Sequence, residues 1–146
     1  MSNSTQSKYG DVKLPSVGLA GNFINGEWSK PIGGKTLAVI NPCRLDTIAN
    51  VGAADARDVD AAVAAAKAAF PKWRRRAARE RGAMLIEFGN RITANAEEIA
   101  KILAAETGNA LRTQSRPEVA STAEVLRYYG GVIAEQTSLG VPFVLR

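Results

Sequence analysis

The chain has 146 residues and a formal net charge of +5, with 46% hydrophobic and 23% charged residues, which are the proportions of an ordinary globular protein of about one domain. Wholesale disorder and a fibrous repeat are therefore excluded. The sequence contains no histidine and a single cysteine, Cys43, which excludes Ser-His-Asp triads, Cys-His pairs, histidine-based zinc sites and any intrachain disulfide.

Residues 1–21 are polar and rich in glycine, proline and serine. They contain no apolar core of the length that a signal peptide needs, and no apolar run elsewhere approaches the roughly 20 residues that span a bilayer. We therefore predict a flexible N-terminal tail and no membrane segment. Together with the single cysteine, this favours a reducing, cytoplasmic location.

The first third after the tail predicts a small β meander. Asn25-Gly26 separates Phe23-Ile24 from Glu27-Trp28, and Asn-Gly tolerates the positive φ values of a type I′ hairpin turn. A β-branched run at residues 36–40 is stopped by Asn41-Pro42, and residues 47–51 follow as its partner. Cys43 lies in the turn between these two strands.

The period of the apolar residues then changes from two to 3.6. Asp55 is placed to cap a helix and Asp58 lies in its first turn, where a carboxylate suits the helix dipole. Eight of the fifteen residues from Ala56 to Phe70 are alanine, and we expect Pro71 to end this helix. Its predicted buried stripe is Val59, Val63, Ala66 and Phe70.

Three more helices are predicted. One runs from about residue 77 to 93; the next begins with a capping-box-like Asn95 and Glu98 and ends at Gly108; the last opens at residues 115–118. Gly130-Gly131 within the last helix either frays it or lets another backbone approach, and fraying is the commoner outcome. The predicted buried residues of these helices are Met84, Leu85, Phe88, Ile92, Ile99, Ile102, Leu103, Val119, Leu126, Tyr129 and Ile133.

Positive charge is concentrated at one junction between helices. The window of residues 67–81 contains one acid, Glu80, and seven basic residues, here called the basic cluster: Lys67, Lys72, Arg74, Arg75, Arg76, Arg79 and Arg81. The window carries +6, so the rest of the chain carries −1. Nucleic-acid binding, with Trp73 stacking on a base, is one interpretation. We favour a second interpretation, in which the charges form a solvated surface and Trp73 packs at the edge of the core. No recognisable base-reading helix and no series of interleaved aromatic residues accompanies the charges.

No catalytic constellation is evident from the residues. The carboxylate pairs Asp58-Asp60 and Glu97-Glu98 lie in first turns of predicted helices, where capping explains them. The glycines form neither a Walker-type loop nor a G-x-G-x-x-G motif. Cys43 has no histidine to act as its base. The residues alone predict an α/β unit without an assembled active site.

The chain from about Asn22 onward resembles the N-terminal part of the NAD(P)-dependent aldehyde dehydrogenase superfamily. Eight stretches carry the resemblance in order, namely FINGEW at 23–28, VINP at 39–42, AADARDVDAAV at 53–63, AAFP at 68–71 with Trp73, ERG at 80–82, NAEE at 95–98, ETG at 106–108 and LRYY at 126–129. The fold that it implies is a partial nucleotide-binding domain over residues 22–137, a small meander with about four helices, followed at 138–146 by the start of an oligomerisation arm.

The resemblance also implies a reaction. Members of the family oxidise an aldehyde to a carboxylic acid by attack of a cysteine thiolate, hydride transfer to NAD or NADP, and thioester hydrolysis with a glutamate as general base. In the family these groups and the main cofactor contacts come after the stretch that this chain matches. We therefore expect the N-terminal segment of such an oxidoreductase, catalytically inactive alone, with no catalytic or cofactor-binding residue of its own and no tight binding of NAD or NADP.

One site is carried over from the family, a structural monovalent-cation site. Its ligands here would be main-chain oxygens near Val39 and Ile40 together with the carboxylate of Glu106, since hard cations prefer oxygen ligands. As partners we expect an aldehyde only in the full-length context, and a homo-oligomer formed through the C-terminal strand. Two alternatives stand beside this: a small basic nucleic-acid-binding protein, and an interaction protein that docks onto full-length subunits through residues 141–145.

Overall fold

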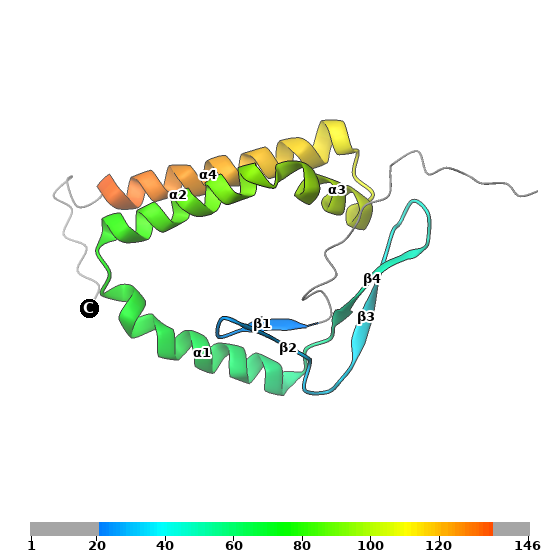
Figure 1. The fold of residues 1–146 in the computed structure, drawn as a ribbon, viewed down its shortest axis with the longest axis horizontal. Coiled ribbons are helices and arrows are strands. Elements are labelled where there is room, and N and C mark those ends of the chain that lie inside the picture. Colours follow the sequence, from blue (N-terminus) through cyan, green and yellow to red (C-terminus); the bar gives the residue numbers. More distant parts are fainter. Residues whose placement is uncertain (1–20, 136–146) are drawn as a thin grey trace, which may run out of the picture.

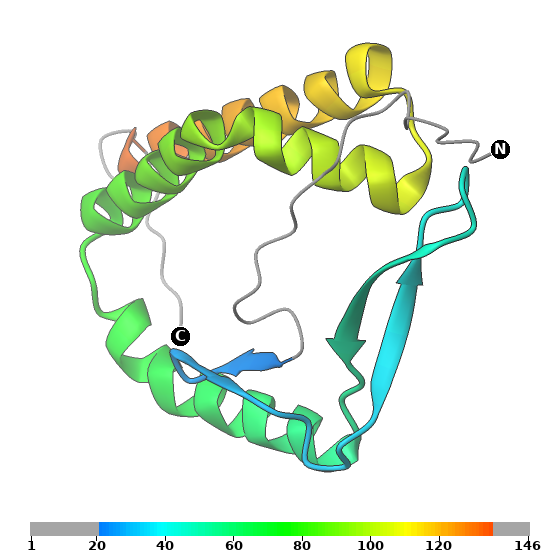
Figure 2. The ribbon, with the colours of Figure 1, turned by 45° about the vertical axis from the view of Figure 1, so that its right-hand side comes forward.

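The computed structural model describes residues 21–135, so the predicted tail at 1–21, except for Gly21, and the predicted arm strand at 138–146 lie outside the described residues. The described elements are arranged around an open ring (Figures 1 and 2). Three helices, α2, α3 and α4, form one side, and α1 with two β-hairpins forms the other. The predicted class, α/β with four α-helices and small antiparallel strands, is confirmed.

The first hairpin pairs β1 (Asn22–Ile24) with β2 (Glu27–Ser29). Its turn is the predicted one: Asn25 has φ 54° and Gly26 has φ 86°, a left-handed backbone that these two residue types tolerate. Phe23 lies opposite Trp28, with their ring centroids 5.1 Å apart. Both residues are 59% exposed, so this face of the hairpin is open, whereas Asn22 and Ile24 on β1 are partly buried.

The second hairpin pairs β3 (Thr36–Ile40) with β4 (Thr47–Gly52), as predicted for these residues. The four strands form two separate hairpins rather than one continuous meander. The intervening segment is held elsewhere, because the Ile32 N–H donates to the Asp58 carboxylate at 3.1 Å and the Ala53 N–H donates to the Lys35 carbonyl at 2.9 Å. The first bond ties the connection to the start of α1, and the second continues the pairing of β3 with β4 by one step.

Helix α1 (Ala56–Arg74) begins with a complete capping box. Asp55 accepts from the Arg57 N–H at 2.9 Å, and Asp58 accepts from the Asp55 N–H at 2.9 Å. The prediction that Pro71 ends the helix is wrong, because the helix continues to Arg74. Proline is tolerated there because it lies close to the C-terminal end of the helix, where few backbone hydrogen bonds of the helix can be lost.

Helices α2 (Ala78–Ala94) and α4 (Arg116–Glu135) lie side by side along most of their lengths (Figures 1 and 2). Glycines bring their backbones together: a Cβ on Gly82 would overlap the Gly130 carbonyl oxygen, and one on Gly89 would lie 2.8 Å from the Ala123 carbonyl oxygen. Gly130 is buried within α4, so the helix does not fray at Gly130-Gly131. Of the two outcomes considered for this pair, close backbone approach is the correct one.

Helix α3 (Ala96–Thr107) ends at Gly108, whose φ of 76° is the predicted left-handed cap. The predicted capping box at its start is absent. The Asn95 side chain instead donates to the Arg91 carbonyl at 2.8 Å, which satisfies the last turn of α2. Only one residue separates the two helices, and the end of α2 takes this side chain. A π-helical turn, Leu111–Ser115, then leads directly into α4.

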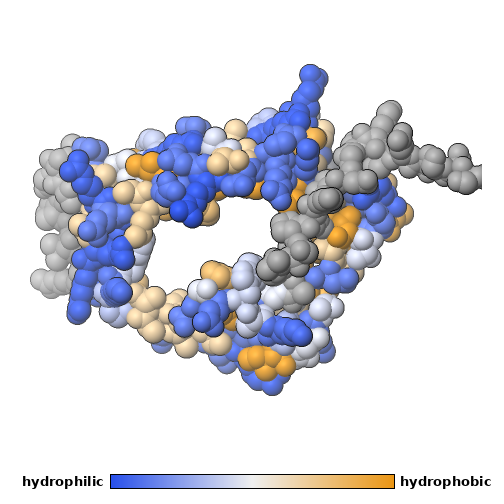
Figure 3. Space-filling view, viewed as in Figure 1, coloured by the Kyte–Doolittle hydropathy of each residue, from blue (hydrophilic) through white to orange (hydrophobic). Residues whose placement is uncertain are grey.

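Buried apolar residues are few and small: in the described part of the chain they are Ala100, Val119 and Ala123. They belong to α3 and α4, on the side of the ring that also holds α2. Several residues predicted to be buried are exposed, namely Val59, Val63, Phe70, Met84, Phe88, Ile99 and Tyr129, whereas Val119 is buried as predicted. The space-filling view shows why, since an opening separates α1 from α2 and hydrophobic surface along α1 borders it (Figure 3).

Candidate functional site

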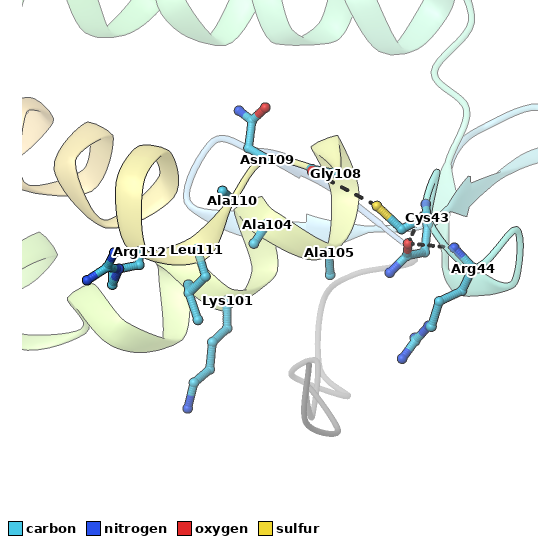
Figure 4. Close-up of a pocket in the computed structure, with 11 residues that line it drawn as sticks. Cys43, Arg44, Lys101, Ala104, Ala105, Gly108, Asn109, Ala110, Leu111 and Arg112 are labelled. Atoms are coloured by element: carbon cyan, nitrogen blue, oxygen red, sulfur yellow. Dashed lines mark hydrogen bonds between the residues drawn. The ribbon is translucent and has the colours of Figure 1, made fainter. Parts of the chain in front are cut away.

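A groove of about 420 Å³ lies between the β3–β4 turn and the C-terminal end of α3. Three cationic side chains border it, from Arg44, Lys101 and Arg112, while small residues such as Ala104 and Ala105 form its wall. Figure 4 shows Cys43 on one side and the Gly108 backbone on the other. This groove contains the one cysteine of the chain and adjoins the predicted cation ligands.

The turn beside the groove is organised by Asn41, which is buried. Its Oδ1 accepts from the Cys43 N–H at 2.9 Å and the Arg44 N–H at 3.2 Å, an Asx turn. Leu45 has φ 62°, and its N–H donates to the Asn41 carbonyl at 2.7 Å. The motif that stops β3 therefore also shapes the loop that approaches α3.

Cys43 has no catalytic partner in this arrangement. Its thiol lies 4.0 Å from the Gly108 carbonyl oxygen and is exposed. Among the described residues, no general base contacts it, and the chain contains no histidine. A nucleophilic thiol is activated by an adjacent base, and that Cys43 is not the family nucleophile stays a prediction.

The three predicted cation ligands lie on elements that meet at this groove. Val39 and Ile40 flank a β-bulge, where the pairing steps from Val39 with Ala49 to Ile40 with Thr47. A bulge breaks the regular ladder and redirects main-chain groups. Glu106 lies in the last turn of α3 and is exposed, and two residues later Gly108 packs against Pro42 and Cys43.

One member of each carboxylate pair has a structural partner. Asp58 is 2% exposed and accepts from the backbone of Ile32 and Asp55. Glu97 accepts two hydrogen bonds from Arg116, both at 2.8 Å, and this contact lowers the pKa of the Glu97 carboxyl. The other members, Asp60 and Glu98, are exposed.

The described residues do not assemble a dinucleotide site. Gly82, Gly89 and Gly130 are used in the contact between α2 and α4, and Gly26 and Gly108 are turn and cap residues. None of them forms a loop of successive backbone N–H groups that could receive a pyrophosphate. Among residues 21–135, these glycines therefore provide no phosphate-binding loop for NAD or NADP.

The sequence did not predict two contacts between distant segments, one ion pair and one hydrogen bond. The ion pair of Arg116 with Glu97 joins the starts of α4 and α3 across nineteen positions, and the bond of Ile32 to Asp58 spans twenty-six. Residues so far apart leave no periodic signal. The available hint was the acidic first turn of each helix, which identifies an acceptor but not its donor.

Comparison with known proteins decides the family. Residues 28–143 match the model of the aldehyde dehydrogenase family. The chain belongs to this family, and it corresponds to the N-terminal segment. It is 41% identical over 112 residues to an aldehyde dehydrogenase of Alternaria alternata, covering 76% of this chain and 22% of the relative. It is 40% identical over 105 residues to malonate-semialdehyde dehydrogenase 1 of Oceanobacillus iheyensis, covering 72% of this chain and 21% of the relative.

The fold agrees with this membership. A mutant of aldehyde dehydrogenase C from Pseudomonas syringae, solved with NAD⁺ and octanal, superposes with a TM-score of 0.81 at 30% identity. The match covers 85% of this chain and 26% of that structure. This aldehyde dehydrogenase family chain thus spans about a fifth of the length of the curated relatives that it matches. No helix among residues 21–135 is long and apolar enough to cross a membrane.

Proposed function

We propose that the chain forms the N-terminal part of the nucleotide-binding domain of an oxidoreductase that converts an aldehyde to a carboxylic acid with NAD or NADP. The observation that carries the proposal is the family match over residues 28–143 together with the fold shared with a structure that holds NAD⁺ and octanal. NAD or NADP supplies the hydride acceptor when bound. Within this proposal the chain acts in the cytoplasm and contributes no catalytic residue, so it is inactive alone.

The contribution of this segment is structural. Helices α2 and α4 form a close pair through Gly82 and Gly130, and α1 presents an uncovered apolar face with Val59 and Val63 more than half exposed. Exposed apolar faces on several elements are typical of a surface completed by further polypeptide. Residues 22–137 form this scaffold, and 138–146 begin an oligomerisation arm through which subunits associate.

A segment exchange tests the proposal. Residues 28–143 replace the matching segment of the Oceanobacillus relative, and reduction of NAD and NADP is followed with malonate semialdehyde. We expect turnover by the chimera and by its Cys43→Ser variant, and none by the 146-residue chain or by the relative without the segment. Turnover by the chain alone would refute catalytic inactivity. A chimera that unfolds cooperatively yet is inactive would refute the structural role.

The cation site is part of the same proposal. The main-chain oxygens near Val39 and Ile40 and the Glu106 carboxylate would hold a monovalent cation beside the negative end of the α3 dipole. We expect the chimera to melt at a higher temperature in potassium or sodium chloride than in choline chloride at equal ionic strength. Glu106→Gln should abolish this difference, and Glu98→Gln, another exposed glutamate of α3, should leave it intact. A difference that survives Glu106→Gln would remove Glu106 from the site.

A further inference from the structure

The basic cluster surrounds the bend at which α1 passes into α2. Arg74 ends α1, residues 75–77 form the connection, and Arg79 and Arg81 lie in the first turn of α2. Figure 3 shows strongly hydrophilic surface at this end of the molecule, next to the junction labelled in Figure 1. The seven charges therefore occupy one corner of the ring instead of being spread along one helix.

The arginines of this cluster differ from the others in the described part of the chain. Five of the six arginines outside the cluster form ion pairs with carboxylates: Arg44, Arg57, Arg91, Arg116 and Arg127. Among residues 21–135, no arginine of the cluster forms one. Arg76 reaches only the Met84 sulfur, at 3.9 Å. The cluster is a concentration of positive charge that the described protein does not neutralise.

Two aromatic rings lie exposed beside these charges. Phe70 is 56% exposed and Trp73 is 41% exposed, so part of each ring is open to solvent in the described structure. The Arg74 guanidinium lies over the Phe70 ring, 5.9 Å from its centroid. Exposed rings between cationic side chains are the combination that single-stranded nucleic acids need for base stacking and phosphate contact.

Part of the basic cluster lies between the stretches that carry the family resemblance. Residues 68–71 with Trp73 match the family pattern, and so do residues 80–82, whereas Arg74, Arg75, Arg76 and Arg79 lie between them. Phe70, Trp73 and Arg81 belong to the matching stretches, so it is the four arginines between them that the quoted motifs do not account for.

We propose that the basic cluster, with Trp73 beside it, binds single-stranded nucleic acid without sequence specificity. The residues outside the window sum to −1, so a second copy of the chain offers little net negative charge to attract the cluster. A lipid surface is a poorer fit, because Trp73 is the one large apolar side chain between residues 71 and 81 and interfacial binding grows with buried apolar area. Phosphate contacts from the arginines and stacking on the Trp73 ring require no reading helix.

Fluorescence anisotropy of the 146-residue chain with a labelled oligouridylate of about 16 nucleotides tests the proposal. With about four phosphates contacted, affinity should fall on the order of 50-fold between about 50 and 200 mM salt. The triple variant Arg75→Gln, Arg76→Gln, Arg79→Gln should bind at least tenfold more weakly in low salt and retain only about a threefold salt effect. Trp73→Leu should weaken binding by about tenfold.

Matched variants separate the cluster from net charge and from misfolding. A triple variant with Lys35, Arg91 and Arg112 changed to Gln removes the same charge elsewhere and should bind like the parent. Changing the three cluster arginines to Lys should preserve binding. Equal loss in both Gln triples, absence of salt dependence, or binding to phosphatidylcholine–phosphatidylserine vesicles without binding to the oligonucleotide would overturn the proposal.

Discussion

At the scale of single residues, buried polar groups connect segments that are distant in the sequence. Asp58 is the clearest case: its carboxylate accepts from Ile32 and from Asp55, so one side chain joins the hairpin connection to the start of α1. The sequence predicted an acid in this helix turn because the dipole favours it. The burial of that acid and its distant donor depend on how the hairpin folds back.

Asp58→Asn should destabilise the chain. The amide retains one acceptor oxygen and puts two donors into a site that presents backbone N–H groups, so at least one charge-assisted bond is lost. We expect a loss of about 1.5–3 kcal/mol in the free energy of unfolding, measured by urea titration. The matched variant Asp60→Asn, at an exposed position of the same helix, should leave the unfolding midpoint unchanged within about 0.5 kcal/mol. Equal effects of the two substitutions would refute this account of Asp58.

The ion pair between Glu97 and Arg116 predicts a pH dependence. Hydrogen bonding to Arg116 lowers the pKa of Glu97 below its ordinary value of 4.5. The stabilisation that follows is complete above pH 4.5 and is lost as the pH falls through the lowered folded value. In an NMR titration, Arg116→Gln should raise the pKa of Glu97, whereas Arg112→Gln should leave it in place. An unchanged Glu97 titration in Arg116→Gln would contradict the assignment.

At the scale of elements, close contacts decide how the helices end and pair. Asn95 was expected to start α3 but instead completes α2, and Pro71 was expected to end α1 but lies within it. In both places two local preferences competed within a few residues. The contact between α2 and α4 also depends on residues distant in the sequence. Glycine is a poor helix former, but in the fold Gly130 lies against the backbone of α2 and forms part of the contact.

Adjacent glycines in α4 allow a controlled test of this contact. Gly82→Ala and Gly130→Ala place a Cβ against the backbone of the opposite helix and should destabilise the pair by about 1–3 kcal/mol. Gly131→Ala meets nothing within 4 Å, so the higher helix propensity of alanine should stabilise by about 0.5–1 kcal/mol. Chemical unfolding midpoints followed by circular dichroism report both signs. A gain in stability from Gly82→Ala would show that the backbones are not in contact.

At the scale of the whole molecule, the open ring leaves apolar surface facing solvent. The stripe of α1 is periodic as predicted, yet Val59, Val63 and Phe70 are each more than half exposed. The small buried core lies in α3 and α4, next to α2. We therefore expect the chain alone to be marginally stable and prone to self-association.

Polar substitutions on α1 should reveal this exposed surface. The double variant Val59→Ser, Val63→Ser should reduce binding of the dye ANS and light scattering while changing the free energy of unfolding by less than about 0.5 kcal/mol. Val119→Ser, at a buried position of α4, should lower that free energy by about 1–3 kcal/mol. Dye binding that persists in the double variant, or a cost equal to that of Val119→Ser, would show that the α1 face is covered.

Local chemistry in the sequence was sufficient for the turns, the cap of α1, the glycine that ends α3 and the order of the elements. Asn25-Gly26, Asp55 with Asp58, and Gly108 each act on backbone groups within about four positions, so neighbouring residues determine their conformations. Such residues also carried the family resemblance.

Tertiary packing determined which side chains are buried and which distant groups form contacts. Whether an apolar stripe is covered, whether Trp73 is buried, and which donors meet Asp58 and Glu97 depend on surfaces formed by residues far apart in the chain. Periodicity identifies a face that is able to be buried, but burial requires a partner surface across the ring. The groove beside Cys43 likewise exists because the β3–β4 turn meets the end of α3, which no local pattern encodes.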